Sequence, residues 1–359
     1  MSVLRVNLPG REYDIRCEKG LLDRAGPLLR PVLRGKLAVI VTDSNVEPLY
    51  AARLARSLHR AGFQAAILEI PAGETSKTPQ VLAELWEQMA DLGLTRSDSV
   101  IALGGGVVGD LGGFAAATIL RGVAFVQIPT TLLAQVDSSV GGKVAVDLEA
   151  GKNLAGAFYQ PKMVLMDPDC LATLPDREFA CGMAEVIKYG CIFDRTFFDW
   201  LRDLGTRERV QGAAADIALR CCDLKRRVVE ADERDTGSRM LLNFGHTLGH
   251  VYEHAGNYQR YTHGEAVAAG MTAAARLGTL LGVTPGGTEA EIANLLQQFR
   301  LPTAIGASKE EFSAVLDRDK KSDGGEISFI VLEEIGQAKA VKLEKRRLLD
   351  LIEEAGLCR

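Results

Sequence analysis

Three histidines late in the chain have the types and spacing of metal-binding or proton-transferring groups. His246 and His250 lie in LNFGHTLGH, one turn apart if that segment is helical, and His263 follows a short tyrosine-rich loop. Imidazoles on one helical face can point into the same cavity, and histidine is a common ligand of divalent metals. The pattern therefore indicates a metal site, although the same spacing is compatible with purely structural histidines.

Charged and polar side chains elsewhere in the second half could complete such a site. In CGMAEVIKYG, Glu185 and Lys188 share one helical face, either as an exposed ion pair or as an oxygen ligand of the metal with a cation beside it. Lys225 belongs to a basic run, and Arg239 and Asn243 lie one turn apart just before the histidines. Basic groups near a metal indicate an anionic substrate.

A glycine-rich loop in the first half is suited to phosphate. Gly104, Gly106 and Gly109 satisfy GxGxxG directly after an apolar run and before a helical one. Backbone amides at such a helix start can receive a pyrophosphate, but the same glycines also serve tight turns and close helix packing. Asp43, which ends LAVIVTD, is the candidate for a ribose contact, and Asp110 either contacts the cofactor or caps the helix.

The elements that position these residues alternate in the first half. Apolar runs predict strands over 37–46, 63–74, 99–106 and 123–133, with helices predicted over 50–62, 81–93 and 107–122. This order predicts a parallel sheet with crossover helices, and such sheets bind ligands at the carboxyl ends of their strands.

From about Pro175 onward, long helical periodicities dominate. EISFIVL (326–332) follows a turn at 323–325 and predicts a small hairpin within this helical part. We therefore expect an α/β N-terminal domain with a parallel sheet, residues 1–174, and a mostly α-helical C-terminal domain, residues 175–359.

Composition narrows the classes of function. The chain has 359 residues and a net charge of −5, without the basic field that nucleic-acid binding needs. The first residues lack the apolar run of a signal peptide, and charges interrupt every stretch of membrane-spanning length. The seven cysteines form no CxxC pair. We expect a cytoplasmic protein with reduced cysteines and neither a nucleic-acid nor a membrane partner.

The chain resembles the dehydroquinate synthase family in five motifs that occur in this order: GGGVVGDLGGFAAAT, IPTTLLAQVDSSVGGKVAVD, GMAEVIKYG, LNFGHTLGH and HGEAVAAGM. The similarity covers nearly the whole chain. It implies that the α/β domain binds NAD, that the helical domain binds metal and substrate, and that the protein is a homodimer. It also implies a divalent metal, Zn²⁺ or Co²⁺, on Glu185, His246 and His263, with His250 contacting substrate and handling protons.

The resemblance further assigns individual contacts. Those to NAD fall on Asp43, Asn45, Gly73, Glu74, Lys77, Gly104, Gly105, Gly106, Val107, Val108, Gly109, Asp110, Thr130, Thr131, Lys143, Lys152, Cys170, Leu171, Ala172 and Thr173. Those to substrate fall on Arg121, Asp137, Lys143, Asn153, Lys188, Lys225, Arg239, Asn243, His250 and Lys321, with Lys320 as the alternative to the last. Ala72 departs from the family pattern, which has an acid in this cofactor turn.

The implied enzyme is a carbon–oxygen lyase that converts the anionic sugar phosphate 3-deoxy-D-arabino-heptulosonate 7-phosphate into 3-dehydroquinate and phosphate. NAD is reduced and reoxidised within the reaction and is not consumed; the reaction combines oxidation, phosphate β-elimination, reduction and an intramolecular aldol closure. The alternatives are a related cyclase of the deoxy-scyllo-inosose or valiolone type, a metal-dependent polyol dehydrogenase, and a non-catalytic phosphate- or nucleotide-binding protein.

Overall fold

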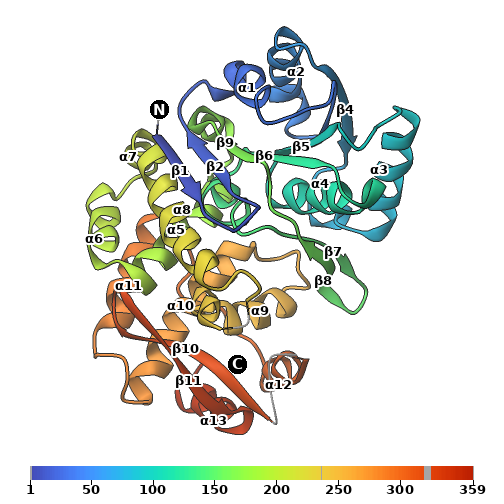
Figure 1. Cartoon of the computed structure of the whole chain (residues 1–359). Coiled ribbons are helices and arrows are strands. Elements are labelled where there is room, and N and C mark those ends of the chain that lie inside the picture. Colours follow the sequence, from blue (N-terminus) through green and yellow to red (C-terminus); the bar gives the residue numbers. More distant parts are fainter. Residues whose placement is uncertain (1, 236, 319–324, 359) are drawn as a thin grey trace. The chain divides into compact units, whose positions relative to one another are not determined.

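The alternating runs of the first half form the expected sheet. In the computed structural model, which describes residues 2–235, 237–318 and 325–358, the sheet has seven strands in the order β1-β2-β9-β6-β5-β3-β4 (Figure 1). All neighbouring strands are parallel except β1 and β2, which form an antiparallel hairpin. The strands are β1 (Ser2–Val6), β2 (Tyr13–Cys17), β3 (Leu37–Asp43), β4 (Gln64–Ile70), β5 (Ser99–Gly104), β6 (Ala124–Pro129) and β9 (Met163–Met166).

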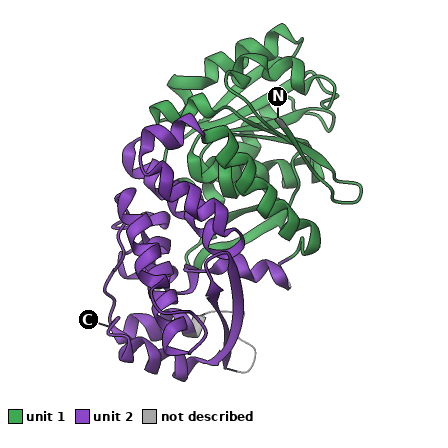
Figure 2. Ribbon diagram, turned by 90° about the vertical axis from the view of Figure 1, so that its left-hand side faces the viewer, with its two compact units in different colours: residues 1–174, 214–234 green, residues 175–213, 235–359 purple. Residues whose placement is uncertain are grey.

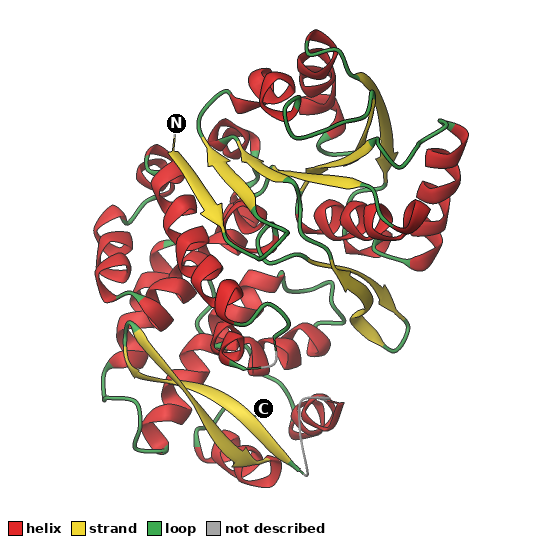
Figure 3. Ribbon diagram, viewed as in Figure 1, coloured by secondary structure: helices red, strands yellow, loops and turns green. Residues whose placement is uncertain are grey.

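Helices cover both faces of this sheet (Figure 3). The helices α1 (Leu21–Leu29) and α2 (Ala52–Arg60) pack on one face, and α3 (Pro79–Asp91) and α4 (Gly106–Thr118) pack on the other. Ala38 and Ile40 of β3 point into the first core, whereas Val39 and Val41 point into the second. Because both faces are buried, this strand is apolar without interruption rather than alternating.

The chain divides into two units, each described here by itself (Figure 2). Unit 1 comprises residues 1–174 and 214–234, and unit 2 comprises residues 175–213 and 235–359. The return of 214–234 differs from the continuous division expected from the sequence. Its helix, α8 (Ala214–Ala231), packs against β1, β2 and the turn η4 (Ala134–Ser138) of unit 1.

Unit 1 also contains a hairpin that the glycine-rich sequence did not predict, formed by β7 (Lys143–Leu148) and β8 (Gly151–Phe158). In unit 2, the expected helical periodicities are confirmed, and α10 packs against α5, α9 and α11. Its helices are α5 (Asp176–Phe193), α6 (Arg195–Leu204), α7 (Arg207–Gly212), α9 (His246–Ala255), α10 (His263–Leu280), α11 (Thr288–Gln298), α12 (Lys309–Arg318) and α13 (Lys345–Glu354).

The expected late hairpin is present in unit 2; of the turn predicted to precede its first strand at 323–325, residues 323 and 324 lie outside the described residues and Gly325 is a turn residue. The strand β10 (Glu326–Glu334) pairs antiparallel with β11 (Gln337–Glu344), which follows it in the chain. The turn between these strands is therefore at Ile335 and Gly336, where Gly336 has a φ of 102°. Among the described residues, no helix is both long and apolar enough to cross a membrane.

Asp98, just before β5, links the starts of two strands. Its Oδ1 accepts the backbone N–H groups of Lys36 and Leu37 at 3.1 and 2.9 Å, next to β3. Its Oδ2 accepts the backbone N–H and the hydroxyl of Thr95 at 2.9 and 2.6 Å. Burial would raise the pKa of Asp98, but these hydrogen bonds outweigh burial and lower that pKa overall.

Replacing Asp98 with alanine should reduce the free energy of unfolding by about 2–4 kcal/mol, because several partly buried donors lose their acceptor. Asp98→Asn, which keeps one acceptor oxygen, should cost less. Since the folded pKa is depressed, the contribution of Asp98 exists above the unfolded value of about 3.9 and is lost as the pH falls through the folded value. Urea titrations at pH 7 and pH 3 would check this. An equal loss at both values would contradict the electrostatic part.

Candidate functional site

A buried carboxylate in unit 2 lies between two imidazoles. Glu185 comes from α5, His246 begins α9 and His263 begins α10. Glu185 Oε1 is 3.1 Å from Nε2 of His263 and 3.4 Å from Nε2 of His246, and one ligand atom from each of the three residues lies within 4.8 Å of the others. One oxygen and two nitrogen donors form the ligand set of a catalytic zinc-type site that keeps a position open. These residues therefore fit a divalent metal.

Local backbone structure fixes where α9 begins. The 3₁₀ turn η6 (Ser238–Asn243) ends before Gly245, whose φ of 79° is left-handed and starts the helix at His246. A Cβ at Gly245 would lie 2.7 Å from the side chain of Met271 on α10, so glycine also permits the close approach of the two helices. This turn places His246 against α10.

The start of α10 is fixed by a capping box and an ion pair. The Thr262 side chain accepts the backbone N–H of Glu265, and the Glu265 side chain accepts the backbone N–H of Thr262. Arg177, in the first turn of α5, donates two hydrogen bonds to Glu265, at 2.9 and 2.7 Å. The start of α5, which carries Glu185, and the start of α10, which carries His263, are thereby joined.

Lys188 compensates the charge of Glu185. The exposed fractions of the two side chains are 2% and 0%, and Lys188 Nζ forms an ion pair with Glu185 Oε2. Burial would raise the pKa of Glu185, but Lys188 and His246 outweigh burial and hold that pKa well below its usual value. The interpretation of these residues as an exposed surface pair is therefore wrong.

The other histidines of α9 lie outside the three-residue group. The His250 ring is 5.9 Å from that of His246, one turn further along the helix, and its side chain is exposed. The His254 ring packs edge-on against Tyr258 with centroids 6.1 Å apart. The helical spacing of His246 and His250 is thus confirmed, and the packing of His254 agrees with a structural role.

Two further residues of unit 2, Arg239 and Cys181, lie in buried positions. Arg239 is 3% exposed and lies with Asn243 on η6, which packs against α5. Cys181 is buried and accepts the backbone N–H of Gly264 at 3.2 Å. Burial raises the pKa of the Cys181 thiol, so the thiolate is disfavoured, which favours a structural role for this cysteine over a catalytic one.

Glu253 was missed in the sequence. It is only 4% exposed, and its Oε1 lies 3.5 Å from Nδ1 of His263. Positions 246, 250 and 253 share one helical face, so the spacing alone could have identified it.

In unit 1, the parallel strands bring most of the expected cofactor residues to one edge. Asp43 ends β3, and the strand pairs Asp43–Ile70 and Gly104–Pro129 align the carboxyl ends of β3 with β4 and of β5 with β6. Other expected cofactor residues follow the carboxyl ends of β3, β4, β5, β6 and β9. They are Asn45, Gly73, Glu74, Lys77, Gly105, Gly106, Val107, Val108, Gly109, Asp110, Thr130, Thr131 and Cys170–Thr173 of the turn η5 (Pro168–Thr173).

Both interpretations of the glycine loop agree with its geometry. A Cβ at Gly104 would lie 2.6 Å from Val108, and one at Gly109 would lie 3.0 Å from Gln127 Oε1, so these glycines permit close packing. At the same time, α4 begins after Gly105 without a side-chain cap, which leaves the amides of its first turn suited to an anion. Asp110 does not cap this helix.

Lys77 contacts two other expected residues, Asp110 and Asn153. Its Nζ lies 2.6 Å from Asp110 Oδ2 and donates a hydrogen bond to Asn153 Oδ1. Burial would lower the pKa of Lys77, but Asp110 and Glu74 outweigh burial and raise that pKa overall. Lys152 Nζ lies 3.6 Å from Glu74 Oε1, so the β7–β8 hairpin lies over the same edge.

A second group in unit 1 joins Asp137 and Lys225. Lys225 Nζ, on α8, donates to the carbonyl oxygen and to Oδ1 of Asp137, at 2.8 and 2.9 Å. Lys143 is exposed at the start of β7. Arg121 ends η3 (Ile119–Arg121), which follows α4 and precedes β6, so it lies at the opposite edge of the sheet. Lys320 and Lys321 lie outside the described residues.

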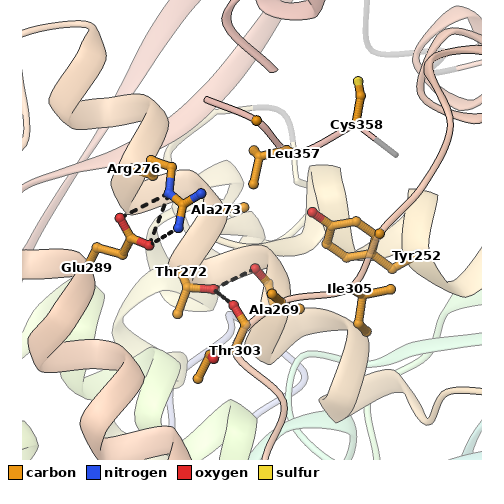
Figure 4. Close-up of a pocket in the computed structure, with 13 residues that line it drawn as sticks. Tyr252, Ala269, Thr272, Ala273, Arg276, Glu289, Thr303, Ile305, Leu357 and Cys358 are labelled. Atoms are coloured by element: carbon orange, nitrogen blue, oxygen red, sulfur yellow. Dashed lines mark hydrogen bonds and ion pairs between the residues drawn. The ribbon is translucent and has the colours of Figure 1, made fainter. Parts of the chain in front are cut away.

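A cavity of about 240 Å³ in unit 2 is separate from the three-residue group (Figure 4). Its lining includes Tyr252 of α9, Ile305 and Cys358. It also includes the ion pair of Arg276 with Glu289, in which Nη2 of the arginine lies 2.5 Å from Oε1 of the glutamate. None of its lining residues belongs to the Glu185–His246–His263 group.

Models of one family match most of the chain. The model described as 3-dehydroquinate synthase N-terminal matches residues 67–181, and that described as 3-dehydroquinate synthase C-terminal matches residues 182–322. The chain is 48% identical to the 3-dehydroquinate synthase of Clostridium beijerinckii, over 94% of this chain and 97% of that protein. It is 43% identical to that of Enterococcus faecalis, over 98% and 99%.

Solved structures of related cyclases share the fold. A 2-deoxy-scyllo-inosose synthase complexed with carbaglucose-6-phosphate, NAD⁺ and Co²⁺ matches with a TM-score of 0.88 and 26% identity, over 98% of this chain and all of that one. The 2-epi-5-epi-valiolone synthase of Streptomyces hygroscopicus, with NAD⁺ and Zn²⁺ bound, matches with a TM-score of 0.87 and 28% identity, over 96% of both chains.

Replacing Lys188 with methionine should reduce the free energy of unfolding of the metal-free protein by about 3–5 kcal/mol, because Glu185 loses its buried counter-ion. Chemical denaturation in the presence of a chelator would measure the loss. The double variant Glu185→Gln, Lys188→Met removes both charges and should recover much of that stability. Strictly additive losses from the two substitutions would contradict this account.

Proposed function

The chain belongs to the 3-dehydroquinate synthase family, and from this premise we propose that it converts 3-deoxy-D-arabino-heptulosonate 7-phosphate into 3-dehydroquinate and phosphate. It is an enzyme of the carbon–oxygen lyase class, and this reaction is the second step of the shikimate pathway to chorismate and the aromatic amino acids. The observation that carries the proposal is the group formed by buried Glu185 and half-buried His246 and His263, in a chain nearly half identical to curated synthases over almost its full length.

We assign NAD to the carboxyl edge of the sheet in unit 1. The uncapped start of α4 offers backbone N–H groups to the pyrophosphate, and Asp43 offers a carboxylate to a ribose hydroxyl. Lys77, held by Asp110, provides a buried cation at the same edge. When bound, NAD takes a hydride from the substrate and returns it within one turnover, so it is not consumed.

We assign Zn²⁺ or Co²⁺ to Glu185, His246 and His263. The donor set of one carboxylate and two imidazoles fits either ion, and the two related cyclases contain Co²⁺ and Zn²⁺. The ion would act as a Lewis acid that makes a substrate hydroxyl more acidic.

The remaining polar residues suit an anionic substrate. Arg239 and Asn243 provide donors for the substrate carboxylate, and Lys188 adds a cation next to the carboxylate ligand. Lys225 and Asp137 form a connected pair that can orient substrate, as can Asn153 beside Lys77.

His250 is exposed one turn from His246, where an imidazole can give and take protons near neutral pH. Arg121, Lys143 and Lys321 stay predictions.

The choice among related reactions depends on the carboxylate. Cyclases of the inosose and valiolone type act on sugar phosphates without this group, so they have no use for donors such as Arg239 and Asn243. A probable glycerol dehydrogenase from Sinorhizobium meliloti matches with a TM-score of 0.65 at 15% identity, a similarity of fold alone. We also propose a cytoplasmic location. We further propose a homodimer, and analytical ultracentrifugation of the holoenzyme would test this oligomeric state.

Incubation with the heptulosonate phosphate, NAD and Zn²⁺ or Co²⁺ should release phosphate and 3-dehydroquinate in equal amounts without net NADH. Glucose 6-phosphate, which lacks the carboxylate, should react with a kcat/KM lower by on the order of 100-fold or more, because the proposed contacts of Arg239 and Asn243 with that group would be lost. Coupled assays of phosphate and dehydroquinate would measure both. Preferred turnover of glucose 6-phosphate would favour a related cyclase, and steady NADH formation from glycerol would favour a polyol dehydrogenase.

The His246→Ala variant should lose metal binding and turnover together, because it removes one of two nitrogen donors. Metal content after dialysis and the rate of phosphate release would be measured on the same preparation. His254→Ala, on the same helix, is the matched control and should keep both. A fully active, metal-loaded His246 variant would be incompatible with the assignment.

A further inference from the structure

Two buried acids face opposite edges of the His263 ring. The Nε2 atom lies 3.1 Å from Oε1 of Glu185, which belongs to the proposed metal site. The Nδ1 atom lies 3.5 Å from Oε1 of Glu253, an ion-pair distance rather than that of a short hydrogen bond. Glu253 is not one of the three proposed ligands, so its place beside His263 needs a separate explanation.

The chemistry of imidazole gives Glu253 a specific task. A neutral ring carries one proton, and a nitrogen that binds a metal must offer its lone pair. If Nε2 of His263 binds the ion, the proton must reside on Nδ1, where it requires an acceptor. A carboxylate is the strongest acceptor that a protein supplies for this purpose, and such partners commonly fix the orientation of metal-binding histidines.

His246 has the same arrangement with a different acceptor. Its Nε2 faces Glu185 Oε1, while its Nδ1 lies 3.2 Å from the carbonyl oxygen of Phe244. Both histidines therefore turn Nε2 toward the common centre and Nδ1 toward an acceptor. The carbonyl belongs to the backbone, whereas Glu253 is a side chain that can be replaced.

The burial of Glu253 also requires that its charge be compensated, and His263 is one of the groups that contribute. The residue is 4% exposed on α9, and a carboxylate in such a position is unfavourable unless it is paired. Its neighbour Tyr252 points away into the separate cavity (Figure 4). The acid therefore lies on the face of α9 that is turned toward His263 rather than on the face that lines the cavity.

We propose that Glu253 is a positioning residue that holds the proton of His263 on Nδ1 and so presents Nε2 to a divalent metal. This role rests on the proposed function, because it presupposes an ion on Glu185, His246 and His263. Glu253 itself does not touch the ion or the substrate.

The test compares Zn²⁺ affinities, measured by competition with a chromophoric chelator, across a set of variants. Glu253→Met fills the space without an acceptor and should weaken binding by about 10- to 100-fold. Glu253→Gln keeps an acceptor oxygen and should recover part of that loss. Tyr252→Phe, an adjacent buried change on the cavity face of α9, is the matched control and should bind as tightly as the wild type.

A second readout separates this role from a general loss of stability. With Co²⁺ in place of Zn²⁺, the visible absorption bands report the geometry of the ligands, and they should change in Glu253→Met but not in Tyr252→Phe. Wild-type affinity and an unchanged Co²⁺ spectrum in folded Glu253→Met would overturn the proposal. Failure of the wild-type protein to bind either ion would overturn the proposed function and, with it, this role.

Discussion

The buried carboxylate of Glu185 is the constraint on which the rest of unit 2 depends. A carboxylate with no exposed surface is unfavourable by several kcal/mol unless nearby groups compensate its charge. Lys188 supplies one compensating charge from the same helix, and the two imidazoles come from the first residues of α9 and α10. The starts of these helices must therefore be fixed within a fraction of a turn. The same convergence of donors on one oxygen makes the group suitable for a cation.

In unit 1, the corresponding constraint is the parallel direction of the strands. Parallel pairing places the carboxyl ends of β3, β4, β5, β6 and β9 at one edge, so residues far apart in the sequence become neighbours. Strand periodicity predicted this edge, because each buried strand is a short apolar run followed by polar or glycine-rich residues. Arg121 shows the limit of the rule, because it follows a helix rather than a strand and lies at the other edge.

The sequence predicted the strands β3, β4, β5, β6 and β10 and the long helices α2, α3, α4, α5, α8, α10 and α11, since these depend on local periodicity, but it did not predict β1, β2 and β9. The Glu–His–His group was implied by the family resemblance. Periodicity does not reveal which surface a helix packs against, so α8 was placed in the second domain. The β7–β8 hairpin was missed because glycines and lysines dominate its strands. Glu253 was missed for another reason: its helical spacing from His246 and His250 was available in the sequence, but its partner His263 belongs to a different helix and is identified only by the structure.

The return of residues 214–234 to unit 1 also affects how the protein is made. The polypeptide passes between the units at three points, so neither unit is a continuous piece that a single cut could release. During synthesis, the surface of β1 and β2 that α8 covers stays open until about sixty further residues have left the ribosome after 174, as counted from the unit boundaries. Unit 1 therefore cannot complete its fold before the first part of unit 2 has emerged, which ties the folding of the two units together in time.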